Sequence, residues 1–213
     1  MRDNKKRDII LDAAEALMCD ISDKDISVEM IAKKAGIGKG SIYYYFESKD
    51  DIVNAVIERS YALAIKEYFN DACGSSDPLT KFKALFRAVI TQEFSDKRKN
   101  IIVYFHVQDN LVLHMKMMMT AVKTISPILT KLLAEGVENG SIRTDYPEES
   151  AEMIVAMLTF LLDKSFFPSD NEGIYRKLKL YAGVLETCLQ AEKGSFDFLF
   201  TPEEYPTYTL TEQ

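Results

Sequence analysis

The sequence predicts an all-α fold, in which a small N-terminal unit of three helices precedes a larger helical body. Only 6 prolines and 9 glycines interrupt the 213 residues, so long segments without helix-breaking residues remain. Within several of these segments, apolar residues recur at helical spacing. Residues 101–110, IIVYFHVQDN, have high strand propensity, but no partner strand appears elsewhere, so we expect this segment to be helical too.

The first three helices are expected within residues 1–48. Apolar residues form one stripe along a helix that covers about residues 4–19. Ser27 is a suitable N-cap for a second, short helix, VEMIAKKA, which Gly36 ends. A third helix begins two residues later with KGSIYYYF. Two short helices joined by a tight glycine turn are typical of the helix-turn-helix motif.

A connecting helix is expected from residue 49 to about residue 70, because Ser48 and Asp51 form a capping box at its start. Later helices are expected at residues 78–94, 111–139, 147–166 and 170–192, with a kink at Pro127 in the second of them. These elements divide the chain into a helix-turn-helix domain at residues 1–48, a helical body at residues 49–193 and a C-terminal tail at residues 194–213. The tail contains four acidic residues and no basic residue.

The composition indicates a soluble globular protein. Hydrophobic residues make up 47% of the chain and charged residues 28%, with a net charge of -7. No apolar run reaches the ~18 residues that are needed to cross a bilayer. The basic N-terminus is not followed by the apolar stretch of a signal peptide. We therefore expect a cytoplasmic protein that does not insert into a membrane.

The sequence offers no arrangement that is typical of an enzyme or a metal site. The three cysteines are widely spaced and include no CxxC pair, and the two histidines lie eight residues apart without a metal-binding motif. The glycines around Lys39 do not fit a phosphate-binding loop, because Gly40 follows the lysine where that loop has Ser or Thr. We expect no enzymatic activity, no cofactor and no metal.

Three consecutive tyrosines, Tyr43, Tyr44 and Tyr45, are the most informative feature of the N-terminal unit. Successive helical residues are about 100° apart, so these side chains and Phe46 cannot share one buried face. Phenol hydroxyls can donate to DNA phosphates, and nearby lysines can neutralise them. The alternative is that the aromatic side chains pack the small domain, which we expect for Phe46. Residues 27–49 are locally basic, although the first 50 residues together are not.

The stretch SVEMIAKKAGIGKGSIYYYFESKDDIVNAV resembles the signature of the tetracycline-repressor (TetR) family of bacterial transcriptional regulators. The resemblance covers about 50 residues of the chain and implies a DNA-binding regulator. Glycine stands at position 38, where this family often has a hydroxyl residue, so base reading is expected to rest more on Ser41 and Tyr44. The family's scaffold positions match Ile31, Ala32, Ala35, Ile42 and Phe46. The residues implied to contact double-stranded DNA are Ser27, Val28, Gly38, Lys39, Gly40, Ser41, Tyr43, Tyr44, Tyr45 and Lys49.

The resemblance also implies a homodimer, in which the last two long helices pair with those of a second copy. Two recognition helices would then address half-sites of a near-palindromic operator about 34 Å apart. The alternative is that these apolar helices form intrachain core. The candidate interface residues are Ile154, Met157, Leu158, Leu161, Tyr181, Val184, Leu185 and Cys188.

The middle helices are implied to enclose an effector pocket. Its candidate lining is largely apolar and aromatic, which points to an apolar or aromatic small molecule, although each methionine could equally be core. The candidates are Phe82, Phe86, Tyr104, Phe105, His106, Gln108, Met115, Met118, Met119 and Phe160.

The function implied is a repressor that a lipophilic small molecule releases from its operator, with corepression left open. Two alternatives dispense with a small-molecule effector. One is a helical dimeric interaction protein with a degenerate DNA-binding unit. The other is a redox-responsive regulator that acts through Cys19, Cys73 or Cys188, although no flanking basic residue lowers the pKa of these thiols.

Overall fold

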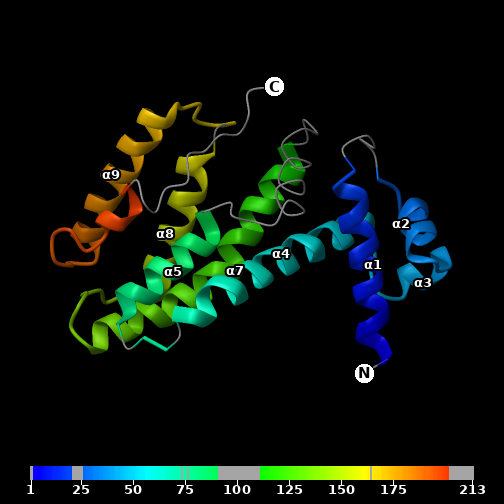
Figure 1. Ribbon diagram of the computed structural model, residues 1–213, viewed down its shortest axis with the longest axis horizontal. Helices are drawn as coiled ribbons and strands as arrows, with labels where there is room; N and C mark the ends of the chain where they lie inside the picture. Colours follow the sequence, from blue (N-terminus) through cyan, green and yellow to red (C-terminus); the bar gives the residue numbers. More distant parts are fainter. Residues whose placement is uncertain are drawn as a thin grey trace. The chain divides into compact units, whose positions relative to one another are not determined.

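The computed structural model describes residues 2–20, 26–72, 74–75, 77–90, 111–163 and 165–201. Within these residues the chain is helical and contains no strand, which confirms the all-α prediction (Figure 1). The expected helix at residues 101–110 lies outside the described residues. The elements are α1 (Arg2–Met18), α2 (Val28–Ala35), α3 (Lys39–Tyr43), α4 (Lys49–Ala72), α5 (Pro78–Ile90), α7 (Leu111–Glu138), α8 (Pro147–Leu162), α9 (Asn171–Cys188) and the 3₁₀ turn η1 (Asp197–Leu199).

The chain forms two compact units. The first comprises Met1–Ser60 with Glu93–Thr120, and the second comprises Tyr61–Gln92 with Ala121–Gln213. Helices α4 and α7 therefore each contribute their N-terminal part to the first unit and the remainder to the second.

The first unit is built on an apolar core between α1, α2, α3 and the start of α4. Ile10, Ile31, Ile42 and Ile52 are each fully buried. Arg59 on α4 joins this helix to α1, since its guanidinium donates to Asp12 over 2.7 Å and also contacts Glu15. These contacts hold α2 and α3 in position within the first unit.

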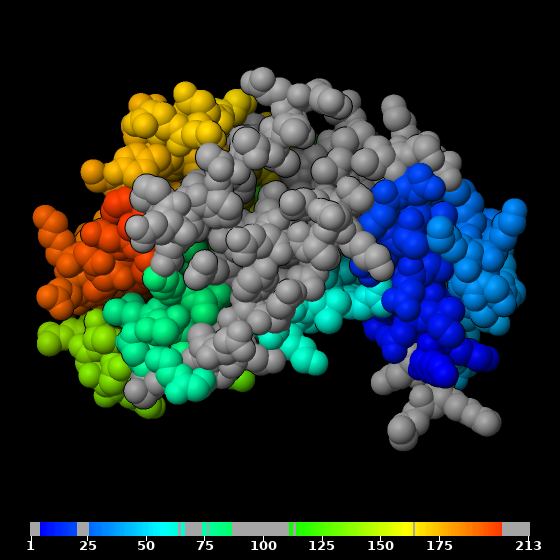
Figure 2. Space-filling model, viewed as in Figure 1, coloured from blue at the N-terminus to red at the C-terminus, as the bar shows by residue number. Residues whose placement is uncertain are grey.

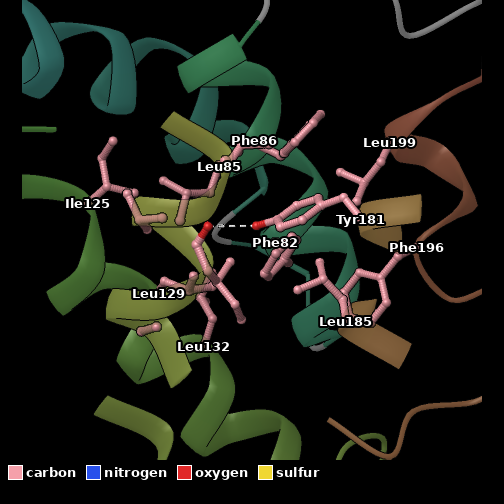
Figure 3. Packing of buried hydrophobic residues seen from close by; sticks show 14 of the residues in the cluster. Phe82, Leu85, Phe86, Ile125, Leu129, Leu132, Tyr181, Leu185, Phe196 and Leu199 are labelled. Carbon is pink, nitrogen blue, oxygen red and sulfur yellow. Dashed lines mark hydrogen bonds between the residues drawn. The ribbon is translucent and has the colours of Figure 1, made fainter. Parts of the chain in front are cut away.

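The second unit contains a large apolar core that draws on α5, α7, α8 and α9 (Figure 3). Tyr181 of α9 is buried in it, and its hydroxyl donates to the backbone carbonyl of Ile154 in α8 over 2.7 Å. A buried phenol needs such a partner, because an unpaired hydroxyl in an apolar core is destabilising. This hydrogen bond fixes α9 against α8.

The C-terminal segment differs from the expected tail. Phe196 and Leu199 are completely buried and belong to the core of the second unit. The backbone N–H of Gly194 donates to a carboxylate oxygen of Glu186 in α9 over 2.6 Å, which ties the segment to that helix. Residues 194–201 are therefore part of the folded body.

Two of the long helices are shorter than expected. Helix α8 ends at Leu162 rather than near residue 166, and α9 ends at Cys188 rather than near residue 192. After α9 the chain turns at Gln190, which has a φ of 44°, and Leu189 is fully buried. Apolar residues after each helix continue the helical spacing in the sequence, but the chain turns at these positions.

Helix α7 is the one helix of the described chain that is long and apolar enough to cross a membrane, from His114 to Glu138. Its length and composition are weak evidence, because core helices of soluble proteins share them. Ile125, Leu129 and Leu132 of α7 are buried in the protein core. Pro127 lies inside this helix without ending it.

Candidate nucleic-acid interface

Helix α2 begins and ends where its sequence predicts. The hydroxyl oxygen of Ser27 accepts from the backbone N–H of Met30 over 3.2 Å, which satisfies one free donor of the first turn. Gly36 adopts the left-handed conformation, with a φ of 67°, and its N–H returns to carbonyls of the last turn. Ile31 and Ala32 are buried below. The helix therefore presents its opposite side to solvent.

Helix α3 has only five residues, and two buried side chains hold it in place. Ile42 within the helix is fully buried, and Phe46 just after it is nearly so. The guanidinium of Arg7 in α1 lies 5.3 Å from the centroid of the Phe46 ring. These contacts determine which side of α3 faces outward.

The tyrosines divide between surface and interior as helical geometry requires. Tyr44 is 74% exposed and Tyr43 is 49% exposed, whereas Tyr45 is partly buried with its ring edge-on to that of Tyr44 at 4.9 Å. Figure 2 shows α2 and α3, in the lighter blue, at the surface of the molecule. A large aromatic side chain that is three-quarters exposed adds little to the stability of a monomer, so Tyr44 is available to a partner.

Two glycines at the start of α3 are not required by the fold. A Cβ atom at Gly38 or Gly40 would meet no heavy atom within 4 Å, and neither residue has a positive φ. Ser41 next to them is partly exposed. The backbone at the N-terminus of α3 is thus bare on its outer side.

Charged side chains line the same surface. The ammonium of Lys39 forms an ion pair with the carboxylate of Glu29 on α2, and both side chains are largely exposed. Lys39 also lies 5.9 Å from the centroid of the Tyr43 ring. The hydrogen bond between the two groups is the main cause that lowers the pKa of Glu29 and raises the pKa of Lys39.

The sequence did not single out Glu29 as part of this surface. Its pairing with Lys39 joins positions ten residues apart across the turn between two helices. Helical spacing alone gives no signal for such a pair, because it depends on the angle between α2 and α3.

Helix α4 starts beside this surface with its predicted capping box. The backbone N–H of Asp51 donates to the hydroxyl of Ser48 over 3.1 Å, and the carboxylate of Asp51 accepts from the N–H of Glu47 over 3.0 Å. Lys49 is the first residue of the helix and is partly exposed. Asp50 forms an ion pair with Lys116 of α7 over 2.5 Å, within the first unit.

The candidate effector residues that the structure describes are divided between the two units, and the pocket stays a prediction. Phe82 and Phe86 are buried, and their rings pack edge-on against Phe196 and Phe198 of the C-terminal segment. Phe160 lies on the surface beside Phe166. Met115, Met118 and Met119 belong to the first unit, whereas Phe82, Phe86 and Phe160 belong to the second. Tyr104, Phe105, His106 and Gln108 lie outside the described residues.

Four of the eight candidate interface residues are core residues of the chain itself, which corrects that part of the prediction. Ile154, Leu158, Tyr181 and Leu185 are all at most 8% exposed and pack in the second unit. Met157 and Cys188 are exposed, and Leu161 and Val184 are partly buried. The sequence did not single out Met153, at 64% exposed, or Leu180, at 70% exposed, on the outer sides of α8 and α9.

The described residues contain no group of His, Cys, Asp and Glu side chains that could hold a metal ion. Cys19 is partly buried and Cys188 is exposed, and neither forms a disulfide. Cys73 lies outside the described residues.

Comparisons with known proteins agree with this geometry. Residues 10–56 match the family model described as "Bacterial regulatory proteins, tetR family", and residues 94–184 match that of the "Tetracyclin repressor-like, C-terminal domain". The uncharacterized HTH-type transcriptional regulator YhgD of Bacillus subtilis is 26% identical over 191 residues, which cover 84% of this chain and 94% of YhgD.

Two further proteins extend the comparison. The HTH-type transcriptional repressor KstR2 of Mycolicibacterium smegmatis is 28% identical over 142 residues, which cover 66% of this chain and 69% of KstR2. The structure of RolR in complex with resorcinol has the same fold, with a TM-score of 0.65 and 17% identity, and covers 97% of this chain and 96% of RolR.

Proposed function

This chain is a DNA-binding transcriptional regulator of the TetR family, and from that premise we propose that it is a repressor which a small apolar or aromatic molecule releases from a near-palindromic operator. Proteins of this family are regulatory rather than enzymatic. Repression is supported by relatives such as KstR2, whose name describes a transcriptional repressor. The regulator would act in the cytoplasm, where the DNA is.

The single observation that carries the proposal is the exposed Tyr44 on a short helix whose other side is locked into a core. Ile42 and Phe46 anchor α3, so Tyr44, Ser41 and the bare backbone at Gly40 are held outward together. Side chains on a rigid helix can read base edges and phosphates in the major groove without a further ordering cost. Lys39 and Lys49 would contact flanking phosphates.

The operator would be read by a homodimer. Two copies place their recognition helices about one helical turn of DNA, roughly 34 Å, apart. The exposed apolar side chains of α8 and α9 supply the surface that such a dimer would bury, which replaces the buried half of the interface predicted from sequence. That surface comprises Met153, Met157 and Leu180, with Leu161, Val184 and Cys188 beside them.

Release by a small molecule requires only that the molecule prefers the form that cannot bind DNA. A coupling free energy of about 1–3 kcal/mol between the effector site and the DNA-binding surface is sufficient. The aromatic and methionine side chains of the middle helices favour an apolar or aromatic effector over a strong anion. RolR, which shares the fold, is described in complex with resorcinol, an aromatic molecule.

The proposal is tested by fluorescence anisotropy of the full chain with labelled duplexes tiled across the DNA upstream of its own gene. We expect one near-palindromic duplex to bind tightly and the affinity to fall as salt rises, because phosphate contacts release counterions. Tyr44→Ala should weaken that binding at least tenfold, in line with about 1–3 kcal/mol for each lost contact to the bases.

Tyr146→Ala is the matched control, since Tyr146 is 66% exposed but lies in the second unit. It should bind the duplex as the wild type does. If Tyr44→Ala and Tyr146→Ala bound the duplex with equal affinity, α3 would not be the helix that recognises the operator. The absence of binding to every tile, and to a pool of random duplexes at low salt, would overturn the proposed function itself.

A further inference from the structure

The DNA-facing surface of the first unit contains a carboxylate that does not fit a simple phosphate-binding patch. Residues 27–49 include four lysines and two glutamates, and Glu29 is the glutamate that lies on α2. A carboxylate at a surface that approaches phosphates repels them. Its presence there needs an explanation beyond solubility.

Glu29 lies where two features of this surface favour a negative charge. It lies in the first turn of α2, where unpaired backbone N–H groups and the helix dipole favour a negative charge. Its side chain also reaches across to the ammonium of Lys39, the first residue of α3. The same two features would bind a DNA phosphate, so the Glu29 carboxylate occupies a phosphate-binding position while DNA is absent.

The pair also fixes the position of Lys39. The ammonium is held between the Glu29 carboxylate and the Tyr43 ring, whose centroid is 5.9 Å away. The Glu29 carboxylate offsets the charge of Lys39, so this lysine attracts a phosphate fully only when it exchanges partners. The cost of that exchange is repaid only when a phosphate stands within hydrogen-bonding distance in a fixed position.

We propose that Glu29 is a specificity-determining residue, which competes with phosphates for Lys39 and so weakens binding to DNA that is not the operator. This inference rests on the proposed function. On a random duplex the protein is not docked in one register, and the diffuse field of the phosphates does not displace a carboxylate in direct contact with Lys39. On the operator α3 is seated in the groove, a phosphate lies beside Lys39, and the exchange takes place.

The test compares Glu29→Gln, Lys39→Gln and the double variant on two labelled duplexes of equal length. One is the operator selected from a random duplex pool by the wild type, and the other is a random sequence. Anisotropy is measured between about 50 and 200 mM salt. Glu58→Gln, on α4, is the control that removes the same charge from the first unit outside α2 and α3.

Glu29→Gln frees Lys39 to neutralise one more phosphate in each subunit of a random-duplex complex. The salt slope should steepen by about 0.9 for each subunit, or about 1.8 for a dimer. The ratio of the Glu29→Gln affinity to the wild-type affinity for the random duplex should then rise by about tenfold as salt falls from 200 to 50 mM. Operator affinity should change by less than about threefold. Lys39→Gln and the double variant should bind the random duplex equally, because Glu29 acts through Lys39.

Three outcomes would overturn the inference. One is an equal gain on operator and random duplex. Another is a higher affinity of the double variant than of Lys39→Gln for the random duplex. Glu29 would then weaken binding by its charge alone and not through Lys39. The third is a Glu29→Gln variant that behaves like Glu58→Gln. Failure of the proposed function looks different, because the wild type would then select no operator from the pool.

Discussion

Replacing Phe196 with alanine tests whether the C-terminal segment is part of the folded body. The Phe196 ring is completely buried and packs edge-on against Phe82, with 5.4 Å between the ring centroids. Truncation of a buried Phe to Ala costs about 3–5 kcal/mol, because apolar contacts are lost and a cavity remains. Proteins of this size have a total stability of about 5–15 kcal/mol, so the expected loss is a large share of it.

The assay is urea unfolding followed by circular dichroism at 222 nm, with a thermal melt as a second measurement. Each kcal/mol corresponds to about 2–4 °C in Tm for a chain of about 150–250 residues, so Phe196→Ala should lower the Tm by about 6–20 °C. The control is Phe167→Ala, since Phe167 is 53% exposed and should cost under about 1 kcal/mol.

This reasoning would be refuted if Phe196→Ala lowered the free energy of unfolding by less than about 1 kcal/mol with an unchanged m value. It would mean that residues 194–201 can leave the core without consequence. A loss for Phe167→Ala as large as that for Phe196→Ala would refute the assignment of burial as the cause.

Three smaller changes test other details. Tyr181→Phe removes the hydrogen bond to Ile154 and should cost about 1 kcal/mol in urea unfolding. Gly36→Ala forces a Cβ into the left-handed region and should cost about 1–2 kcal/mol, seen in the Tm. The hydrogen bond that the Thr80 hydroxyl donates to the Asp77 carboxylate is the main cause that lowers the pKa of Asp77. The stability that Asp77 contributes should therefore be present above about pH 4 and be lost as pH falls through the lowered pKa. Asp77→Ala should therefore cost about 1 kcal/mol at pH 7 and progressively less as the pH falls below about 4, in unfolding curves recorded across this range.

The local elements of the DNA-binding unit could be read from sequence because their signals lie within a few residues. The Ser27 cap, the left-handed Gly36 and the Ser48–Asp51 capping box each join positions at most four residues apart along the chain. The residue types that make such contacts can be recognised from the neighbouring sequence alone. The ends of α8 and α9 lie earlier than the sequence predicts, because apolar residues beyond each helix continue the helical pattern although the chain turns there. Leu189 is buried in the turn after α9, whereas Phe167 after α8 is exposed, so neither burial nor hydrophobicity marks a further helical turn.

Apolar side chains on a long helix do not reveal what they pack against. Ile154 and Leu158 belong to the chain's own core, whereas Met153 and Leu180 face outward on α8 and α9. All three residue types are typical of either role, so the sequence could predict apolar helices but not which of their faces is exposed. The same limit applies to Phe82, which packs against Phe196 and stays only a predicted pocket residue.

An acidic chain can still bind DNA because contact, rather than net charge, decides the outcome at physiological salt. The net charge is -7, of which residues 1–50 contribute only -1, so most of the excess lies in the remainder of the chain. Charges more than a Debye length away, about 8 Å at 0.15 M, are largely screened from the phosphates. The carboxylates that matter are therefore those within the DNA-facing surface itself. Glu29 is such a residue, and a change in its charge should alter DNA binding more than the same change at Glu58, outside that surface.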